Sequence, residues 1–428
     1  MGMGLTRRTF GGLALGALLA ACGMDAEDLE VADMVPDSPS SSGADRPPVT
    51  LPMRDVEGGD PRIAGEAISK VADGLFAATR TEANHTISPI SIAIAVAMLE
   101  PGASGAAIGE LRALFGIDPA DADAFHQSMG ALEVSLEELR AGLTFRLANS
   151  AYVQEGFPFE DAYLQALGTS YGAALVESDF ATQAEAERVA INEWVEEQTE
   201  GFIPDLMPEG SVHGQTVLVL VNALYLLATW ETAFDAEQTT ELDFTRFDGS
   251  TVGVDMLRGS VDAAWQGDGF VAGEKRYDGG LVAQFVLPDD GRFDEVADAL
   301  DAALSNRPQR TPGGGALFLP KFETRSKAEL VDALRANGVS AIFGSGGLEG
   351  ISPVGDLAVD EVVHQTYVSF DEKGTEAAAA TGISVRTTSA AIEPEVSVIL
   401  DRPFLYRIVD TESGATVFVG QVLDPTAG

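Results

Sequence analysis

The chain has 428 residues, 45% of them hydrophobic, which is enough for one large folded domain or two ordinary ones. Its 26 Lys and Arg residues stand against 67 Asp and Glu residues, and the formal net charge of -41 argues against nucleic acid and heparin-like polyanions as partners. Basic partners are favoured instead, although an acidic surface selected for solubility or for a salty habitat explains the charge equally well.

The first 22 residues have the features of an export signal. An apolar run from residue 11 to 21 is too short to span a membrane as a mature helix. Thr6-Arg7-Arg8-Thr9-Phe10 resembles a twin-arginine signal, and Leu19-Ala20-Ala21-Cys22 resembles a bacterial lipobox, in which cleavage exposes the cysteine for lipidation. Cys22 is the only cysteine, so no intramolecular disulfide can form. The sequence therefore predicts a lipoprotein anchored through Cys22 in the cell envelope or outside the cell, with an ordinary secretory signal as the alternative.

Residues 23–61 are acidic, rich in proline and serine, and without apolar periodicity. Such a composition cannot bury enough apolar surface to fold, so we expect a disordered tether between the lipid and the domain. Ordered structure is expected to begin at Arg62.

Helices are expected first in the domain. Ile63, Ile68 and Val71 open a series at helical spacing, and a second helix is expected from Pro89 to Glu100 with Ser88 as its N-cap. Apolar segments rich in β-branched residues predict strands at 217–227, 281–287, 396–400 and 416–422. Because helices and strands interleave without a regular βαβ alternation, the sequence predicts an α+β fold.

Several patterns give only weak support to enzyme chemistry. Residues 168–172 match G-x-S-x-G around Ser170, but a helix expected just before them is the wrong context for a nucleophile elbow, so a hydrolase is a remote alternative. The glycine-rich stretches 313–315 and 344–350 lack the lysine of a phosphate-binding loop and are expected to be loops. The four histidines are scattered, so no metal site is predicted.

The segment from Val363 to Pro425 resembles the C-terminal part of the serpin family, with the reactive-loop hinge followed by the last strands. The matching residues are His364, the run from Asp371 to Thr381, Arg402-Pro403-Phe404 and Val419-Gly420. Further family blocks occur in the family's order: Asn84, Ser88-Pro89-Ile90-Ser91, Ala148-Asn149, Ile191-Asn192-Glu193-Trp194-Val195, Asn222-Ala223-Leu224-Tyr225, Trp230, Leu287-Pro288 and Leu319-Pro320-Lys321-Phe322.

This resemblance implies one serpin domain over residues 62–428, with three β-sheets, about eight or nine helices and an exposed reactive loop at about 372–395. It implies an inhibitor rather than an enzyme, without a cofactor and expected to act as a monomer. Its partner would be a target protease, which attacks the loop as a substrate and is trapped as an acyl-enzyme when the loop inserts into the main sheet. Serine proteases are the expected targets, with cysteine proteases left open. The alternative is a non-inhibitory serpin that acts as a chaperone or binding protein.

The hinge suits insertion as a strand, because side chains alternate between the two faces of a sheet. Counting in twos from Thr375 gives an inward set without charge, whereas the intervening positions carry Glu376 and Arg386. Burying an unpaired charge costs several kcal/mol, so this alternation is what an insertable strand requires. The residues assigned to the hinge are Glu372, Gly374, Thr375, Ala377, Ala378, Ala379 and Ala380.

By the same resemblance, a polar cluster under the sheet, the shutter, comprises Ser88, Ser91, Asn192 and His364. The breach, where the loop enters the sheet, comprises Trp230, Lys321 and Glu372. The family's spacing from Glu372 places the reactive bond at Thr388-Ser389, with Arg386-Thr387 as the alternative.

Overall fold

Two strand systems form the frame of this computed structural model, which describes residues 54–138, 140–305, 311–354, 357–359, 362–375 and 396–427. All of these residues belong to one compact unit, Pro39–Gly428. A six-stranded sheet has the order β10-β11-β12-β4-β2-β3. Its strands are β2 (Leu143–Gln154), β3 (Ala174–Ser178), β4 (Leu218–Thr229), β10 (Phe322–Glu329), β11 (Val363–Phe370) and β12 (Gly374–Thr375).

The second system is a nine-stranded array with the order β1-β15-β14-β8-β7-β6-β9-β13, in which β5 also pairs with β6. Its strands are β1 (His85–Ile87), β5 (Thr240–Thr245), β6 (Thr251–Gly267), β7 (Phe270–Arg276), β8 (Leu281–Pro288), β9 (Thr311–Pro320), β13 (Val398–Ile399), β14 (Phe404–Asp410) and β15 (Thr416–Val422). The long strand β6 pairs with β5 along its first part and with β7 at its end, so it connects two sheets. The described strands thus form three sheets, as predicted.

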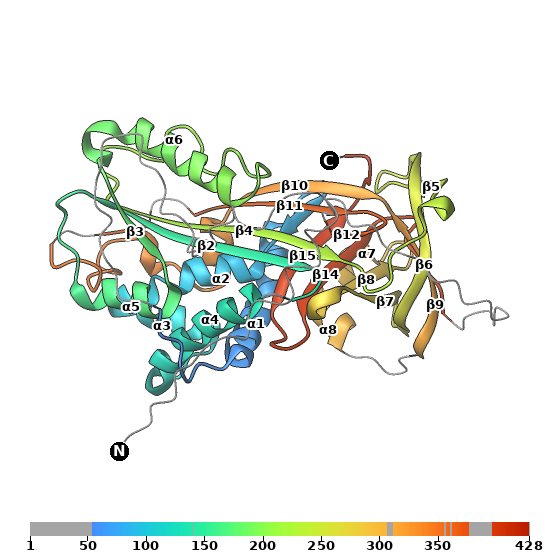
Figure 1. Ribbon diagram of the computed structural model, residues 1–428, viewed down its shortest axis with the longest axis horizontal. Coiled ribbons are helices and arrows are strands. Elements are labelled where there is room, and N and C mark those ends of the chain that lie inside the picture. The colour runs from blue at the N-terminus through green and yellow to red at the C-terminus, as the bar shows by residue number, and fades with distance from the viewer. Residues whose placement is uncertain are drawn as a thin grey trace, which may run out of the picture. The chain divides into compact units, whose positions relative to one another are not determined.

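Nine α-helices occur among the described residues, which agrees with the predicted number. They are α1 (Pro61–Thr79), α2 (Pro89–Ala97), α3 (Gly105–Phe115), α4 (Ala122–Glu137), α5 (Asp161–Tyr171), α6 (Phe180–Gln198), α7 (Phe293–Asp298), α8 (Leu300–Ser305) and α9 (Val331–Ala336). Figure 1 shows α6 on one face of the six-stranded sheet and the group of α2, α4 and α5 on the other.

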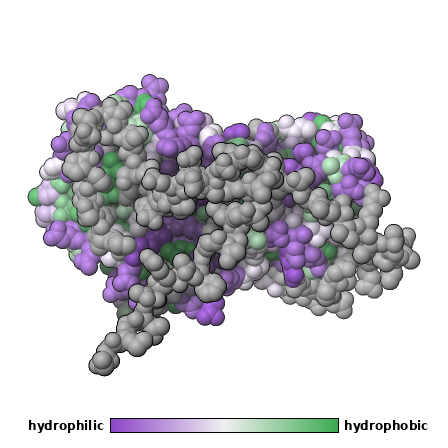
Figure 2. Space-filling model, viewed as in Figure 1, coloured by the Kyte–Doolittle hydropathy of each residue, from purple (hydrophilic) through white to green (hydrophobic). Residues whose placement is uncertain are grey.

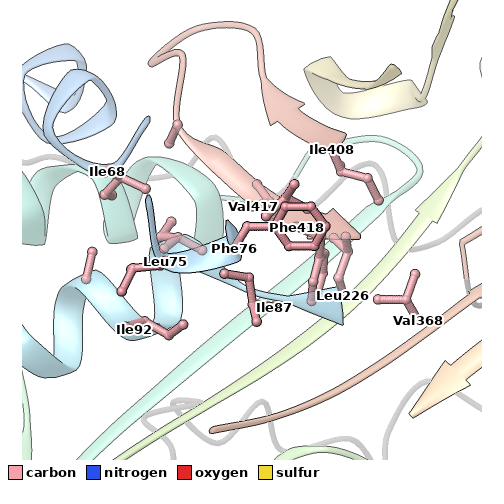
Figure 3. Packing of buried hydrophobic residues seen from close by; sticks show 14 of the residues in the cluster. Ile68, Leu75, Phe76, Ile87, Ile92, Leu226, Val368, Ile408, Val417 and Phe418 are labelled. Atoms are coloured by element: carbon pink, nitrogen blue, oxygen red, sulfur yellow. The ribbon is translucent and has the colours of Figure 1, made fainter. Parts of the chain in front are cut away.

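The main core lies between α1, α2 and the strands around them. Figure 3 shows Phe76 of α1, Ile87 of β1 and Phe418 of β15 packed together near Leu226 of β4 and Val368 of β11, so both strand systems contribute to one core. A second, smaller core under α6 contains Tyr152, Phe180, Ile191, Trp194 and Val195, among others. The helix α6 is therefore attached to the sheet by a core of its own.

Most of the predicted elements are present, with shifted ends. Ser88 is the N-cap of α2, and its side chain accepts a hydrogen bond from the Ser91 amide. The strand expected at 416–422 is β15, and those expected at 217–227 and 281–287 are β4 and β8. The segment expected as a strand at 396–400 pairs only at Val398 and Ile399, with β9. The α+β class is confirmed.

Two sequence predictions are wrong. Ordered structure begins before Arg62. The helix α1 begins at Pro61, with the Asp60 side chain capping it. Further upstream, Arg54 Nη2 donates a hydrogen bond to the carbonyl oxygen of Tyr171 at 2.5 Å. Proline at the first helical position and aspartate at the N-cap are signals of a helix start. The composition of residues 23–61 had nevertheless indicated a tether that includes both residues. Residues 313–315 are not a loop but part of β9.

Hydrophilic residues dominate the described surface that is visible in Figure 2, as the acidic composition leads one to expect. Within the described part of the chain, no helix combines the length and the apolar character needed to cross a membrane.

Candidate functional site

A tight turn connects β11 to β12. The Asp371 amide donates a hydrogen bond to the Gly374 carbonyl oxygen at 3.0 Å, and Asp371 Oδ1 accepts from the amides of Lys373 at 2.7 Å and Gly374 at 3.0 Å. Aspartate stabilises turns in this way because its carboxylate mimics a backbone acceptor. A Cβ on Gly374 would collide with the carbonyl oxygen of Ala228 in β4. Only glycine therefore fits where the chain enters the sheet.

The two residues of β12 lie between β11 and β4. Thr375 is opposite Phe370 of β11 and Ala228 of β4, and Gly374 is opposite Thr229. The Thr375 side chain is 2% exposed, and its hydroxyl makes a hydrogen bond with the Tyr277 hydroxyl at 2.5 Å. The inward orientation predicted for Thr375 is thus present in the structure. The short strand β12 marks the position in the sheet from which a longer strand would continue.

The residues assigned to the breach meet at this turn. Lys321 Nζ lies 3.0 Å from Glu372 Oε2, and the Thr239 hydroxyl donates to Glu372 Oε1 at 3.0 Å. Burial raises the pKa of the Glu372 carboxyl, but hydrogen bonds from its own amide, Lys321 and Thr239 outweigh burial and leave the pKa below its usual value. The Lys321 side chain is 45% exposed and that of Glu372 is 18% exposed, so the ion pair is partly screened by solvent.

Trp230 joins the turn to the aromatic core. Its amide donates to the Lys373 carbonyl oxygen at 2.7 Å, and its indole Nε1 donates to the Asp371 carbonyl oxygen at 3.0 Å. The indole ring stacks on the Tyr277 ring with centroids 4.0 Å apart and planes 12° apart. Trp230 therefore fixes both the backbone of the turn and the position of Tyr277. We call Trp230, Lys321 and Glu372 the breach cluster.

Sequence reasoning missed Lys275, which lies beside the breach cluster. Its side chain is 3% exposed, and its Nζ lies 4.5 Å from the ring centroid of Phe234 and 5.5 Å from that of Trp230. Burial lowers the pKa of the Lys275 ammonium to about 8. Lys275 stands in the charged run Glu274-Lys275-Arg276, and only the burial pattern of β7 identifies the lysine as internal.

A buried polar network joins α2 to β4 and β11. The Ser88 amide donates to His364 Nε2 at 2.9 Å, and Ser88 Oγ accepts from the Ser91 amide at 3.4 Å. The Ser91 hydroxyl donates to Asn222 Oδ1. Burial, with a smaller effect of His85, lowers the pKa of His364 to about 3, so its imidazole is neutral near pH 7. The network connects the two strands that flank β12.

The prediction that Asn192 belongs to the shutter is wrong. Asn192 Nδ2 donates to Asp205 Oδ1 and to the Met207 carbonyl oxygen, both at 2.9 Å, and Asn192 Oδ1 accepts from the Met207 amide at 2.7 Å. Asn192 thus holds the segment after α6. Asn222 of β4 takes the expected place, and it stood in one of the family blocks but was not assigned a role. We call Ser88, Ser91, Asn222 and His364 the shutter cluster.

The remaining predicted site residues lie outside the described residues: Cys22, Ala377, Ala378, Ala379, Ala380, Arg386, Thr387, Thr388 and Ser389. Ser170 is described. It is 7% exposed and lies within α5, so residues 168–172 do not form the strand-to-helix turn that a nucleophile elbow needs. Among the described residues, no group of three or more His, Cys, Asp or Glu side chains could hold a metal ion.

Known proteins are similar to this chain in both sequence and fold. The family model of serpin, serine protease inhibitor, matches residues 66–425. Serpin A3-1 of Bos taurus is 33% identical over 354 residues, covering 80% of this chain and 84% of that protein. Serpin-Z2A of Oryza sativa subsp. japonica is 33% identical over 395 residues, covering 80% and 92%. The crystal structure of human glycosylated kallistatin superimposes with a TM-score of 0.73 at 26% identity, covering 86% of this chain and all of that one.

The chain belongs to the serpin family. It has the serpin fold, and serpins are generally protease inhibitors rather than enzymes.

Proposed function

We propose that this serpin is a suicide-substrate inhibitor of serine proteases. The protease nucleophile attacks the carbonyl carbon of Thr388, the bond to the Ser389 nitrogen breaks, and an acyl-enzyme forms. The freed N-terminal arm of the loop then extends β12 between β4 and β11 and carries the protease along the sheet before water can release it. The chain supplies no catalytic group, and cysteine proteases, which also form acyl-enzymes, are a second target class.

The observation that carries this proposal is the position of Gly374 and Thr375. Gly374 pairs with β4, and Thr375 pairs with both β4 and β11, so the start of the inserting strand already has its sheet neighbours. Further insertion adds ladder hydrogen bonds without having to close a new loop at the entrance. The uncharged inward residues of the hinge sequence support the same mechanism.

The test is complex formation with purified trypsin-like, elastase-like and subtilisin-like proteases. We expect a covalent complex that survives SDS with at least one of them. Thr375→Arg, which puts a cation at a 2% exposed position, should abolish the complex and leave the loop cleavable. Glu376→Arg, on the outward set, is the matched control and should keep it. If no protease forms a complex and the loop is merely cleaved, the inhibitory function is wrong.

The reactive bond is tested separately. Mass spectrometry of the C-terminal peptide released from the complex should give a fragment that begins at Ser389. A fragment that begins at Thr387 would move the bond to Arg386-Thr387 and make trypsin-like proteases the targets.

The second candidate is a non-inhibitory serpin that acts as a chaperone or binding protein. Cleavage without a complex would favour it. The uncharged inward positions of the hinge favour the inhibitor, because a loop that never inserts has no need of small, neutral residues at every second position.

We further propose that the protein is exported by the twin-arginine-like signal and works as a monomer, held in the cell envelope by a lipid on Cys22. In detergent phase partitioning, the mature protein should enter the detergent phase and the Cys22→Ser variant the aqueous phase. Equal partitioning of the two would refute the anchor, and the inhibitory proposal would be unaffected.

A further inference from the structure

The hydrogen bond between Tyr277 and Thr375 stands out among the contacts at the breach because both hydroxyls are buried. Tyr277 is 3% exposed and Thr375 is 2% exposed, and their oxygens are 2.5 Å apart. Among the described residues, the two hydroxyls are hydrogen-bonded to each other. A buried hydroxyl that loses its partner is costly, so the two groups hold each other in place.

The ring of Tyr277 is held in one position by its surroundings. It stacks on Trp230 at 4.0 Å, and its amide donates to the Leu281 carbonyl oxygen at 3.0 Å. Trp230 in turn packs edge-on against Phe234, with centroids 6.0 Å apart. The Tyr277 hydroxyl is therefore held in one position just after β7. Thr375, at the start of the reactive loop, is the residue that bonds to it.

We propose that Tyr277 is a positioning residue for reactive-loop insertion: its hydroxyl keeps Thr375 between β4 and β11, so that insertion starts from a strand that is already nucleated. This inference rests on the proposed inhibitory function. Insertion competes with hydrolysis of the acyl-enzyme. When Thr375 leaves the sheet, the strand has to re-enter before it can extend, and that delay favours hydrolysis.

Amide hydrogen exchange tests the contact without any protease. Tyr277→Phe keeps the aromatic stack and removes only the hydroxyl, and Thr375→Val removes the partner at nearly constant volume. Each variant leaves one buried hydroxyl unpaired, so we expect exchange at residues 371–375 to speed up by about tenfold. In the double variant the two apolar groups face each other, and exchange should return to within about threefold of the parent.

Tyr171→Phe is the matched control. Tyr171 is also fully buried, and its hydroxyl makes a hydrogen bond with His126 Nδ1 at 2.6 Å, between α5 and α4. Its loss should lower the melting temperature without changing exchange at residues 371–375. If Tyr277→Phe behaves like this control, the hydroxyl only stabilises the core, and the proposal is overturned.

The protease assay adds the functional readout. Tyr277→Phe should lower the ratio of trapped complex to cleaved serpin by several-fold, while the rate at which the protease first attacks the loop stays unchanged, and the double variant should recover the ratio. An unchanged ratio would overturn the role in insertion. If the parent itself traps no protease but the exchange results hold, the inhibitory function fails and the role of Tyr277 in holding Thr375 stands.

Discussion

The breach cluster lies just beyond the ends of β4 and β11, the shutter cluster includes Asn222 and His364 within these strands, and the two clusters are built from different chemistry. The breach cluster holds a partly exposed ion pair, and the backbone of β12 already lies beside it. In the shutter cluster Ser88, Ser91 and His364 are buried and Asn222 is half-buried, and the interacting groups are hydroxyl, amide and neutral imidazole. In the proposed mechanism the strand enters from solvent at the breach cluster, where charged side chains keep their hydration, whereas in the core separated charges would cost several kcal/mol.

This difference bears on how the sheet can open. A neutral network can break and re-form its hydrogen bonds without leaving an unpaired charge in the core. In the proposed mechanism it can therefore hold the closed sheet and still allow β4 and β11 to separate. The ion pair at the breach cluster orients the turn at Glu372 and adds little stability. We therefore expect the largest mutational effects in the shutter cluster and the smallest at the ion pair.

His364→Ala should have the largest effect. It removes a buried ring and leaves the Ser88 amide without its acceptor, so the free energy of unfolding at pH 7 should fall by about 3 kcal/mol. Denaturant unfolding measures this. His213→Ala, at an exposed histidine, is the control and should change little.

The pH dependence of stability independently tests whether His364 is neutral in the folded protein. Its pKa is about 3 in the folded protein and near 6.5 in the unfolded chain, so the unfolded chain binds the proton first. The stability that the neutral imidazole contributes is present above about pH 6.5 and is lost as the pH falls toward 3. His364→Ala should flatten the stability profile in this window, and an unchanged profile would contradict the neutral shutter cluster.

Lys275→Met should stabilise the protein at pH 7, by up to about 3 kcal/mol, because it replaces a buried ammonium with an apolar chain of similar length. In the parent, the folded-state pKa of about 8 lies below the usual 10.5, so stability should rise as the pH increases from 8 to 10.5. The variant should lack this rise. If the variant were destabilised at pH 7, the contacts of the ammonium with the two aromatic rings would outweigh its burial.

Asn222→Ala and Asn192→Ala compare an asparagine of the shutter cluster with an asparagine outside it. Asn222→Ala should lower the free energy of unfolding by about 1–2 kcal/mol and speed up amide exchange at Ser88 and Ser91. Asn192→Ala should leave those amides unchanged and increase proteolysis after α6, where it binds Met207. The reverse pattern would restore Asn192 to the shutter.

The smallest effect is expected for Lys321→Gln. The lysine side chain is 45% exposed, so loss of the ion pair should cost less than about 1 kcal/mol, and salt should shrink the difference further. A loss of 3 kcal/mol or more would show that the breach cluster is as stabilising as the shutter cluster.

Much of this fold could be predicted from the sequence. The helix signals around Ser88 and the apolar strand segments are local, and the family blocks gave the three sheets. The breach cluster was predicted because Trp230, Lys321 and Glu372 stand in distinctive motifs. The inward orientation of Thr375 followed from strand alternation alone.

The failures involve tertiary contacts. Asn192 and Asn222 are chemically identical and both stand in family blocks, so only their neighbours in space distinguish them. Lys275 was missed because a lysine is rarely buried, and its place beside aromatic rings depends on the pairing of β7 with β8. Pro61 and Asp60 were assigned to the tether on composition, which outweighed the capping signal that they also carry.

The central claim is that the reactive loop inserts as a new strand next to β12. Cleavage within the loop followed by thermal unfolding tests it most directly, because the inserted strand adds ladder hydrogen bonds and buries new side chains. We predict a clearly higher melting temperature for the cleaved protein than for the intact protein, and Thr375→Arg should suppress the increase. Equal melting temperatures before and after cleavage in the parent would contradict loop insertion.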